Sequence, residues 1–187
     1  VYSGYANNNS TRIQLQNTVN SGLYSLYENR TAQQVLGGAI IFYNTLGASV
    51  LYSINYYDDY NVDLPSGFTA PTKVYSDIVN VTTKTKDLPT VNKVRVLGTS
   101  NWITTVTYYD EKARPIYVYS KNEYLNTVDI IESKLDFTGK VLETRTTHKK
   151  TGKNDIVTID RFEYDHMDRL INQTQKINNQ ISNRVVK

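Results

Sequence analysis

Hydrophobic and polar residues alternate along the second half of the chain with the two-residue period of a β-strand. The alternation is clearest in "WITTVTYY" at 102–109 and in "IVTIDRFEY" at 156–164. The second stretch carries apolar residues on both faces, with Val157 and Ile159 on one face and Ile156, Phe162 and Tyr164 on the other. Apolar character on both faces is typical of strands within a large curved sheet.

Each stretch is followed by a turn-rich tetrad and then by another strand-like run, "RPIYVYS" from residue 114 or "RLINQTQKI" from residue 169. A strand, a short turn and a second strand form the pattern of a β-hairpin. The chain also contains 16 tyrosines and a heavy share of threonine, valine and isoleucine, which pack well on a pleated surface. The sequence therefore predicts an all-β fold of consecutive antiparallel β-hairpins.

The chain changes in character along its length, and its 187 residues can bury one hydrophobic core. Charges are scarce up to about residue 55 and dense after residue 84, with a Pro- and Gly-containing stretch between. We expect a β-rich segment at 1–62, an irregular connection at 63–90 and a hairpin array at 91–187. Residues 10–29 fit either Tyr-rich strands or a short helix that places Leu15, Val19, Leu23 and Leu26 near one face.

Three turns in the array share one pattern, seen in "YYDEKARPI" at 108–116, "LDFTGKVL" at 135–142 and "EYDHMDRLI" at 163–171. In each, an Asp ends the incoming strand, the place three residues later suits glycine, and Arg or Lys comes next. The Asp carboxylate can cap backbone N–H groups, and glycine supplies a left-handed conformation. The basic residue could pair with an Asp of its own or of a neighbouring hairpin. The motif residues are Tyr109, Asp110, Arg114, Asp136, Gly139, Lys140, Tyr164, Asp165, Arg169 and Leu170.

The three turns are not identical. The glycine place holds Ala113 in the first turn and Asp168 in the third. Aspartate tolerates a positive φ fairly well and alanine does so poorly, so we expect the turn at 110–114 to be of a different type. The anchoring aspartates are 26 and then 29 residues apart, which predicts an irregular array.

Tyr-Asp-x-x-Gly-Arg-Leu is the motif of the Rhs/YD-repeat family, and residues 40–178 resemble that family in its Bacteroidetes form. Supporting stretches lie at 54–61, 88–117 and 132–150, and a weaker echo places Tyr43, Asn44 and Gly47 in the motif. The resemblance implies that consecutive hairpins wind into part of a large hollow shell, whose interior can hold a C-terminal toxin or another cargo domain. It also implies that the motif residues are scaffold and not a reaction centre.

On this resemblance we expect a non-catalytic scaffold segment of a bacterial protein that is secreted or exposed at the cell surface, without a cofactor or metal. The partners would be the rest of its own polypeptide, an enclosed toxin domain and the secretion machinery during export. We expect an interior piece of a longer polypeptide, since the chain begins at Val1 and stops at "NRVVK". The alternative is a surface adhesin or carbohydrate-binding module whose outward Tyr, Asn and Lys side chains contact a glycan.

Other functional patterns in the sequence are weak. The absence of cysteine excludes thiol catalysis, disulfides and thiolate metal sites, and neither His148 nor His166 has a nearby nucleophile or metal pattern. Residues 59–63 alternate Asp, Asn and Asp like the start of a calcium loop, but Leu64 and Ala70 replace the expected Gly and Glu. The "KKTGKN" stretch at 149–154 lacks the first glycine of a P-loop.

Tyrosines in the array could have a second use. Tyr117, Tyr119 and Tyr124 could stack on sugar rings, although packing within the sheet is the favoured interpretation.

The charge pattern argues against nucleic acid as a partner, and the length of the apolar runs argues against a membrane span. The chain has 21 basic and 18 acidic residues, mixed along its length, and the net charge of +3 is too small for a nucleic-acid binder. The longest apolar run, "VLGGAIIFY" at 35–43, is too short for a membrane span.

Overall fold

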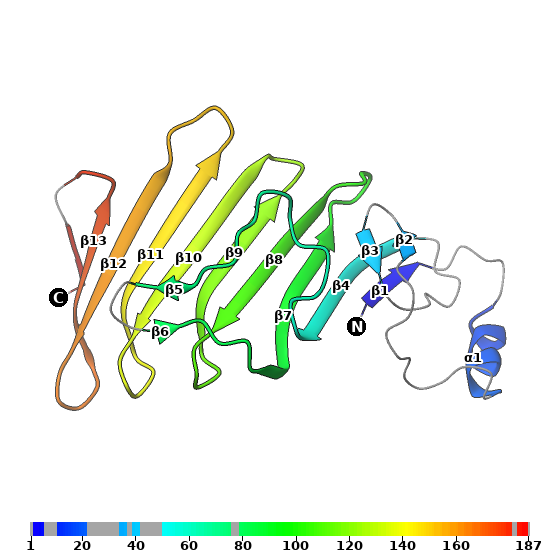
Figure 1. The fold of residues 1–187 in the computed structure, drawn as a ribbon, viewed down its shortest axis with the longest axis horizontal. Coiled ribbons are helices and arrows are strands. Elements are labelled where there is room, and N and C mark those ends of the chain that lie inside the picture. The colour runs from blue at the N-terminus through cyan, green and yellow to red at the C-terminus, as the bar shows by residue number, and fades with distance from the viewer. Residues whose placement is uncertain are drawn as a thin grey trace.

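The computed structural model of the protein describes residues 2–5, 11–21, 34–36, 39–41, 50–75, 79–180 and 183–186. Apart from one short helix, the regular structure within these ranges is β-strand, and Figure 1 shows most of it in one broad sheet. The predicted all-β fold is therefore confirmed.

The sheet contains ten strands in the order β1-β4-β7-β8-β9-β10-β11-β12-β13-β14, and neighbouring strands are antiparallel. From β7 onward each strand pairs with the next one in the chain, so the predicted consecutive hairpins are confirmed. The strands are β1 (Tyr2–Tyr5), β4 (Val50–Asp58), β7 (Thr85–Arg95), β8 (Trp102–Tyr109), β9 (Pro115–Asn122), β10 (Thr127–Leu135), β11 (Val141–Lys150), β12 (Ile156–Tyr164), β13 (Leu170–Ile177) and β14 (Asn183–Val186).

Two small ribbons and the helix complete the described structure. β2 (Gln34–Leu36) pairs with β3 (Ala39–Ile41), and β5 (Lys73–Val74) pairs with β6 (Val79–Asn80). The helix α1 spans Arg12–Asn20, so within 10–29 the helical alternative is realised for these residues. A capping box starts it: the Thr11 hydroxyl accepts the Gln14 N–H, and the Gln14 side chain accepts the Thr11 N–H at 2.7 Å. Leu23, Leu26 and the weak repeat echo at Tyr43, Asn44 and Gly47 lie outside the described residues.

The expected connection at 63–90 does not interrupt the sheet. β4 pairs directly with β7, and β7 begins at Thr85, inside that range. Pro89, which suggested a loop, lies in β7 opposite Tyr57, where the register shifts on both sides of the tyrosine. Such a bulge accommodates a residue that has no N–H to give to the ladder.

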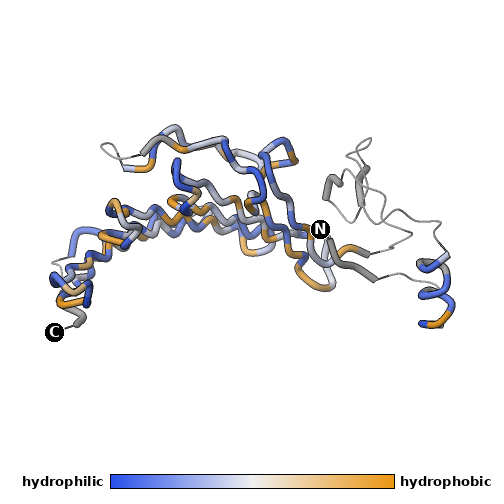
Figure 2. The backbone as a smooth tube through the Cα atoms, turned by 90° about the horizontal axis from the view of Figure 1, so that it is seen from below, coloured by the Kyte–Doolittle hydropathy of each residue, from blue (hydrophilic) through white to orange (hydrophobic). Residues whose placement is uncertain are grey.

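The chain between β4 and β7 forms a second layer. Residues 59–75, which we call the crossing segment, pass over β8 and β9 as far as β10 before the chain returns. Figure 2 shows this layer above the sheet, which bends away from it toward the C-terminal strands. The crossing segment therefore covers the convex face of the sheet.

The hydrophobic core lies between these two layers. Along β8 the side chains of Trp102, Thr104, Val106 and Tyr108 are buried, while Ile103, Thr105 and Thr107 between them are partly exposed. Tyr109 at the end of the strand is also buried. The buried cluster continues into the neighbouring strands and β5 through Leu51, Ile54, Tyr56, Val74, Val91, Ile116, Tyr117 and Tyr119. Strands β11, β12 and β13 contain no fully buried residue. The sheet is thus most firmly packed at its centre and least covered at its C-terminal end.

Candidate functional site: the turn ladder and the cleft beneath the crossing segment

The three turns of the repeat have the same backbone structure. In each, the N–H of the anchoring aspartate donates to the carbonyl of the residue four positions later, at 2.9 Å for Asp110, Asp136 and Asp165 alike. The N–H three positions after the aspartate donates back to its carbonyl, at 3.0, 3.2 and 3.0 Å. These turns join β8 to β9, β10 to β11 and β12 to β13, so they lie at the same end of the sheet.

Each anchoring carboxylate caps its own turn. Oδ1 of Asp110 accepts the N–H groups two and four positions later, at 2.8 and 2.9 Å. Oδ1 of Asp165 makes the same two contacts at the same distances. Oδ1 of Asp136 accepts three backbone N–H groups at 2.8 to 2.9 Å and also the Thr138 hydroxyl at 2.6 Å. The aspartate therefore satisfies N–H groups that the turn leaves without a strand partner.

The turn at 110–114 is of the same type as the other two. Ala113 has a φ of +61°, Gly139 one of +101° and Asp168 one of +63°, so all three lie on the positive-φ side of the Ramachandran plot. The expectation that alanine would change the turn type is wrong. The Asp110 cap and the Arg114 contacts hold the alanine there, although an L side chain disfavours this conformation.

The basic residue after the glycine place returns to the anchoring aspartate. Arg114 Nε lies 2.6 Å from Asp110 Oδ2, and Arg169 Nε lies 2.7 Å from Asp165 Oδ2. Lys140 makes a longer contact of 3.6 Å to Asp136 Oδ2. The pairs differ in burial, because the Asp110 side chain is 2% exposed and that of Asp165 is 16% exposed. The first turn thus holds its ion pair away from water more completely than the third.

These contacts lower the pKa of all three carboxyls. The hydrogen bond from the Thr138 hydroxyl, with those from the backbone, lowers the pKa of Asp136 to about 2 despite partial burial. Burial alone would raise the pKa of Asp110, but hydrogen bonds from Arg114 and Lys112 outweigh it and lower that pKa. The backbone and side chain of Arg169 lower the pKa of Asp165. The folded turns therefore favour the ionised carboxylates.

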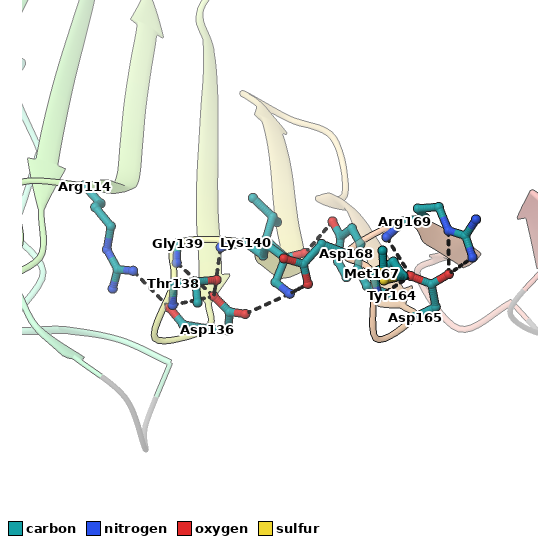
Figure 3. A network of polar contacts seen from close by, with 11 residues as sticks. Arg114, Asp136, Thr138, Gly139, Lys140, Tyr164, Asp165, Met167, Asp168 and Arg169 are labelled. Carbon is teal, nitrogen blue, oxygen red and sulfur yellow. Dashed lines mark hydrogen bonds and ion pairs between the residues drawn. The ribbon is translucent and has the colours of Figure 1, made fainter.

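Successive turns are also joined to one another, and we call this series of contacts the turn ladder. Arg114 Nη1 donates to the Asp136 carbonyl at 2.9 Å, and Lys112 Nζ donates to the Phe137 carbonyl at 3.0 Å. Lys140 continues the series by pairing with Asp168, a contact that raises the lysine's pKa. Figure 3 shows the contacts from Arg114 through Lys140 to the third turn.

Tyr109 and Tyr164, which precede two of the anchoring aspartates, each donate a hydrogen bond to a neighbouring strand at the same end of the sheet. Tyr109 donates its hydroxyl to the Pro89 carbonyl on β7 at 2.5 Å, and Tyr164 donates to the Val141 carbonyl on β11 at 3.0 Å. Each tyrosine therefore contacts the strand that precedes its own. Lys140 Nζ also lies 5.6 Å from the centre of the Tyr164 ring. Leu170 starts β13 opposite Tyr164 and is exposed.

A cleft opens on the convex face, between the tip of the crossing segment and strands β9, β10 and β11. Its volume is about 490 Å³. The tip is a turn in which the Phe68 N–H donates to the Pro65 carbonyl at 3.0 Å and Gly67 has a φ of +78°. The lining residues are Ser66, Gly67, Phe68, Thr69, Tyr117, Tyr119, Lys121, Asn126, Thr127, Val128, Ile130, Lys149 and Thr151.

Aromatic packing holds the tip against the sheet. The Phe68 ring meets that of Tyr119 edge-on, with 4.8 Å between centroids, and Tyr60 stacks on Tyr108 at 4.1 Å. The Tyr60 hydroxyl also donates to the Thr107 carbonyl at 2.7 Å. Burial, together with neighbouring tyrosines, raises the pKa of Tyr60. The crossing segment is therefore fixed at several points along the core.

The other candidate residues have structural contacts. His148 Nδ1 lies 2.6 Å from Asp129 on the uncovered face, and His166 lies in the third turn. In the would-be calcium loop, Asp59 caps the Asn61 N–H at 2.8 Å and Asp63 pairs with the buried Lys93. Among the described residues no group of three or more His, Cys, Asp or Glu could hold a metal ion.

Sequence reasoning found the turn residues and only part of the cleft. Tyr117 and Tyr119 were candidates for sugar stacking, and both are largely buried while still lining the cleft. Tyr124 is not among the lining residues and is 58% exposed. Lys121, Lys149 and the tip residues were missed. The one available signal was the Pro-Ser-Gly-Phe turn at 65–68, which does not reveal where its tip will dock.

Comparisons with protein families, curated proteins and solved structures found no match for this chain. No helix in the described ranges is long and apolar enough to cross a membrane.

Proposed function

We propose that the chain is a non-catalytic wall segment of a secreted or surface-exposed bacterial protein of the Rhs/YD-repeat type. In this role its hairpins help to build a β-shell around a toxin or another effector domain. The observation that carries the proposal is the turn ladder, in which Arg114 and Lys140 join successive hairpins at one edge of the sheet. Such contacts would resist separation of the strands more than independent hairpins could.

The curvature of the sheet supports the proposal. The sheet bends away from the crossing segment, which leaves its uncovered face on the concave side. Hydrogen-bonded polar pairs lie on that face, since Asn92 donates to Asn55 at 2.7 Å and Thr105 donates to Ser120 at 3.2 Å. Exposed apolar side chains lie on the same face, among them Val94, Ile131 and Ile156, so the concave surface is mixed. A mixed concave surface is suited to facing an enclosed domain.

The strand order supports the same role. The ten-stranded sheet ends at β1 and β14, and further strands could extend it by main-chain hydrogen bonds. In the proposed parent protein the partners at these edges are other hairpins of the same polypeptide. The proposal also includes an enclosed cargo domain and, during export, the secretion machinery as partners of the chain.

Protease protection of the enclosed domain tests the proposal. The polypeptide that contains this chain is treated with a protease, and cleavage of its enclosed domain is compared with that of the same domain expressed separately. We expect strong protection in the wild type and faster cleavage in Asp110→Ala, which loosens the turn ladder. Lys150→Gln, an exposed change on β11, serves as the control. Equal cleavage of the enclosed and the separate domain would contradict the proposal.

A second candidate function, carbohydrate binding at the surface, is favoured by the cleft beneath the crossing segment. Aromatic rings and hydroxyl groups line it together, and this combination suits a sugar ring and its hydroxyls. Saturable binding of a soluble saccharide, mapped to the cleft by chemical shifts, is the test. No binding across a panel of acidic and neutral saccharides would contradict this second proposal.

A further inference from the structure

We infer that the cleft beneath the crossing segment binds an acidic saccharide and that Lys149 and Lys121 recognise its carboxylate. This inference rests on the second proposed function, carbohydrate binding, and is independent of the wall proposal. It adds a ligand class and the residues that select it.

The size and lining of the cleft set the kind of ligand. A volume of about 490 Å³ falls within the range of small-molecule sites, roughly 300–1,000 Å³, and leaves room for about one or two sugar rings. Phe68 and Tyr119 form its aromatic wall, with Tyr117 beside them. Tyr117 and Tyr119 are largely buried, so the partly exposed Phe68 ring offers most of the apolar contact to the C–H face of a sugar.

The charge of the cleft favours an anion. Among the described residues that line the cleft, the charged ones are Lys121 and Lys149, and none is Asp or Glu. Lys121 Nζ donates to the Ser66 carbonyl at 2.9 Å, and Lys149 Nζ lies 3.6 Å from Asp155 on the exposed loop after β11. The first is a single contact to a loop carbonyl and the second a half-exposed ion pair, so a ligand carboxylate can compete with both.

The remaining polar groups point to a polyhydroxylated ligand. Ser66, Thr69, Thr127 and Thr151 provide hydroxyls and Asn126 provides an amide, so the lining offers both donors and acceptors. None of the described lining residues is an arginine, so the two lysine ammonium groups would hold an anionic group without a bidentate guanidinium contact. Long polyanions such as nucleic acid are disfavoured by the mixed charges of the chain and its net charge of +3.

The test compares two disaccharides that differ in one group. Cellobiouronic acid carries a carboxylate where cellobiose carries a hydroxymethyl, and the binding of each to the whole chain is measured by NMR titration. We expect the acid to bind about tenfold more tightly, the gain typical of one added charge-assisted hydrogen bond. We also expect the largest shifts at Gly67, Thr127 and Thr151.

Lys149→Gln is the matched variant and Lys150→Gln its control. The two lysines are neighbours on β11, but Lys150 does not line the cleft. We expect Lys149→Gln to remove most of the preference for the acid while cellobiose binding stays unchanged, and Lys150→Gln to keep the preference. Lys121→Gln should also reduce it, and urea unfolding of each variant verifies that the fold is intact.

Each other outcome overturns a defined part of the account. Equal affinity for both disaccharides would overturn carboxylate recognition and leave carbohydrate binding standing. An equal loss in Lys149→Gln and Lys150→Gln would show unspecific attraction by surface charge, which also overturns the inference. Binding of neither disaccharide would overturn the inference, and a lack of binding to the wider saccharide panel would then overturn carbohydrate binding as well.

Discussion

Arg114 connects two successive turns of the sheet: its Nη1 donates to the Asp136 carbonyl at 2.9 Å, while its Nε donates to Asp110 Oδ2 at 2.6 Å. Residues 114 and 136 are 22 positions apart in the chain. Because the guanidinium is planar and rigid, both contacts depend on one relative position of the two turns. The side chain therefore fixes the spacing of adjacent hairpins as well as closing its own turn.

Replacing this arginine by lysine should weaken the sheet although the charge is kept. An ammonium group on a flexible stem cannot hold the carboxylate and the carbonyl in the same geometry. We expect Arg114→Lys to lower the free energy of unfolding by about 1–2 kcal/mol, measured by urea denaturation. Arg169→Lys is the control, because Arg169 contacts the anchoring aspartate of its own turn. Equal losses in both variants would contradict a role for Arg114 between turns.

The anchoring aspartates should differ in importance according to their burial. Asp110→Ala removes a nearly buried carboxylate and leaves two N–H groups and a guanidinium without their acceptor. We expect a loss of about 2–4 kcal/mol in unfolding free energy. Asp165→Ala should cost less, because Arg169 is 74% exposed and water can replace its partner. The ranking would be contradicted if the third turn proved the more sensitive one.

The glycine place can be tested by a reciprocal exchange. Ala113→Gly should stabilise the chain by about 0.5–1 kcal/mol, since glycine adopts the observed φ of +61° without a Cβ penalty. Gly139→Ala should destabilise it by about 1 kcal/mol or more, because its φ is +101°. A Cβ at residue 139 would meet Arg114 at an ordinary 3.5 Å, so the cost would be conformational. Thermal unfolding of both variants measures the two effects. A stabilising effect of Gly139→Ala would contradict the proposed conformational preference for glycine at this place.

The sequence was sufficient to predict the hairpins, because their alternation and turn residues are local signals. The prediction of a different turn type at Ala113 was wrong, because hydrogen bonds among Asp110, Lys112 and Arg114 outweigh the low propensity of alanine for a positive φ. Sequence reasoning also misjudged Pro89, because a register shift opposite that residue cannot be read from one strand. Contacts between turns depend on how the strands align, which the spacing of the aspartates alone does not give.

Acid should weaken the fold within a limited pH range. The three anchoring carboxyls have a lowered pKa in the folded chain, about 2 for Asp136, against an ordinary value of 3.8. The stability that they contribute is therefore fully present above about pH 5 and is lost as the pH falls toward about 2. Urea midpoints measured across this range should fall, and the fall should be smaller in Asp136→Asn. A midpoint that stays constant down to about pH 2 would contradict the proposed role of these carboxylates.

The crossing segment should open locally when its aromatic anchor is removed. Phe68→Ala takes away the contacts with Tyr108 and Tyr119, and we expect a loss of about 1–3 kcal/mol. Hydrogen exchange should accelerate in the crossing segment while β8 and β9 keep their protection. Phe137→Ala is the control, because that side chain is 82% exposed on a turn. Faster exchange throughout the sheet would instead show that the segment and the strands unfold together.

The position of the cleft could not be predicted from the sequence, because it depends on contacts between distant parts of the chain. Lys121 and Lys149 lie on different strands, and the Ser66 tip reaches them only because the crossing segment passes over β8 and β9. The turn at the tip is visible in the sequence, but its docking place depends on aromatic contacts between residues about forty to fifty positions apart, such as Phe68 with Tyr108 and Tyr119. Local patterns carry no information about such a distant partner.

The central claim, that these hairpins form the wall of an enclosing shell, is tested most directly by electron cryo-microscopy of the polypeptide that contains this chain. The account predicts a closed β-wall in which the turns of Asp110, Asp136 and Asp165 follow one edge, the crossing segment lies outside and density for another domain fills the interior. An open, elongated sheet with an empty concave face would contradict it.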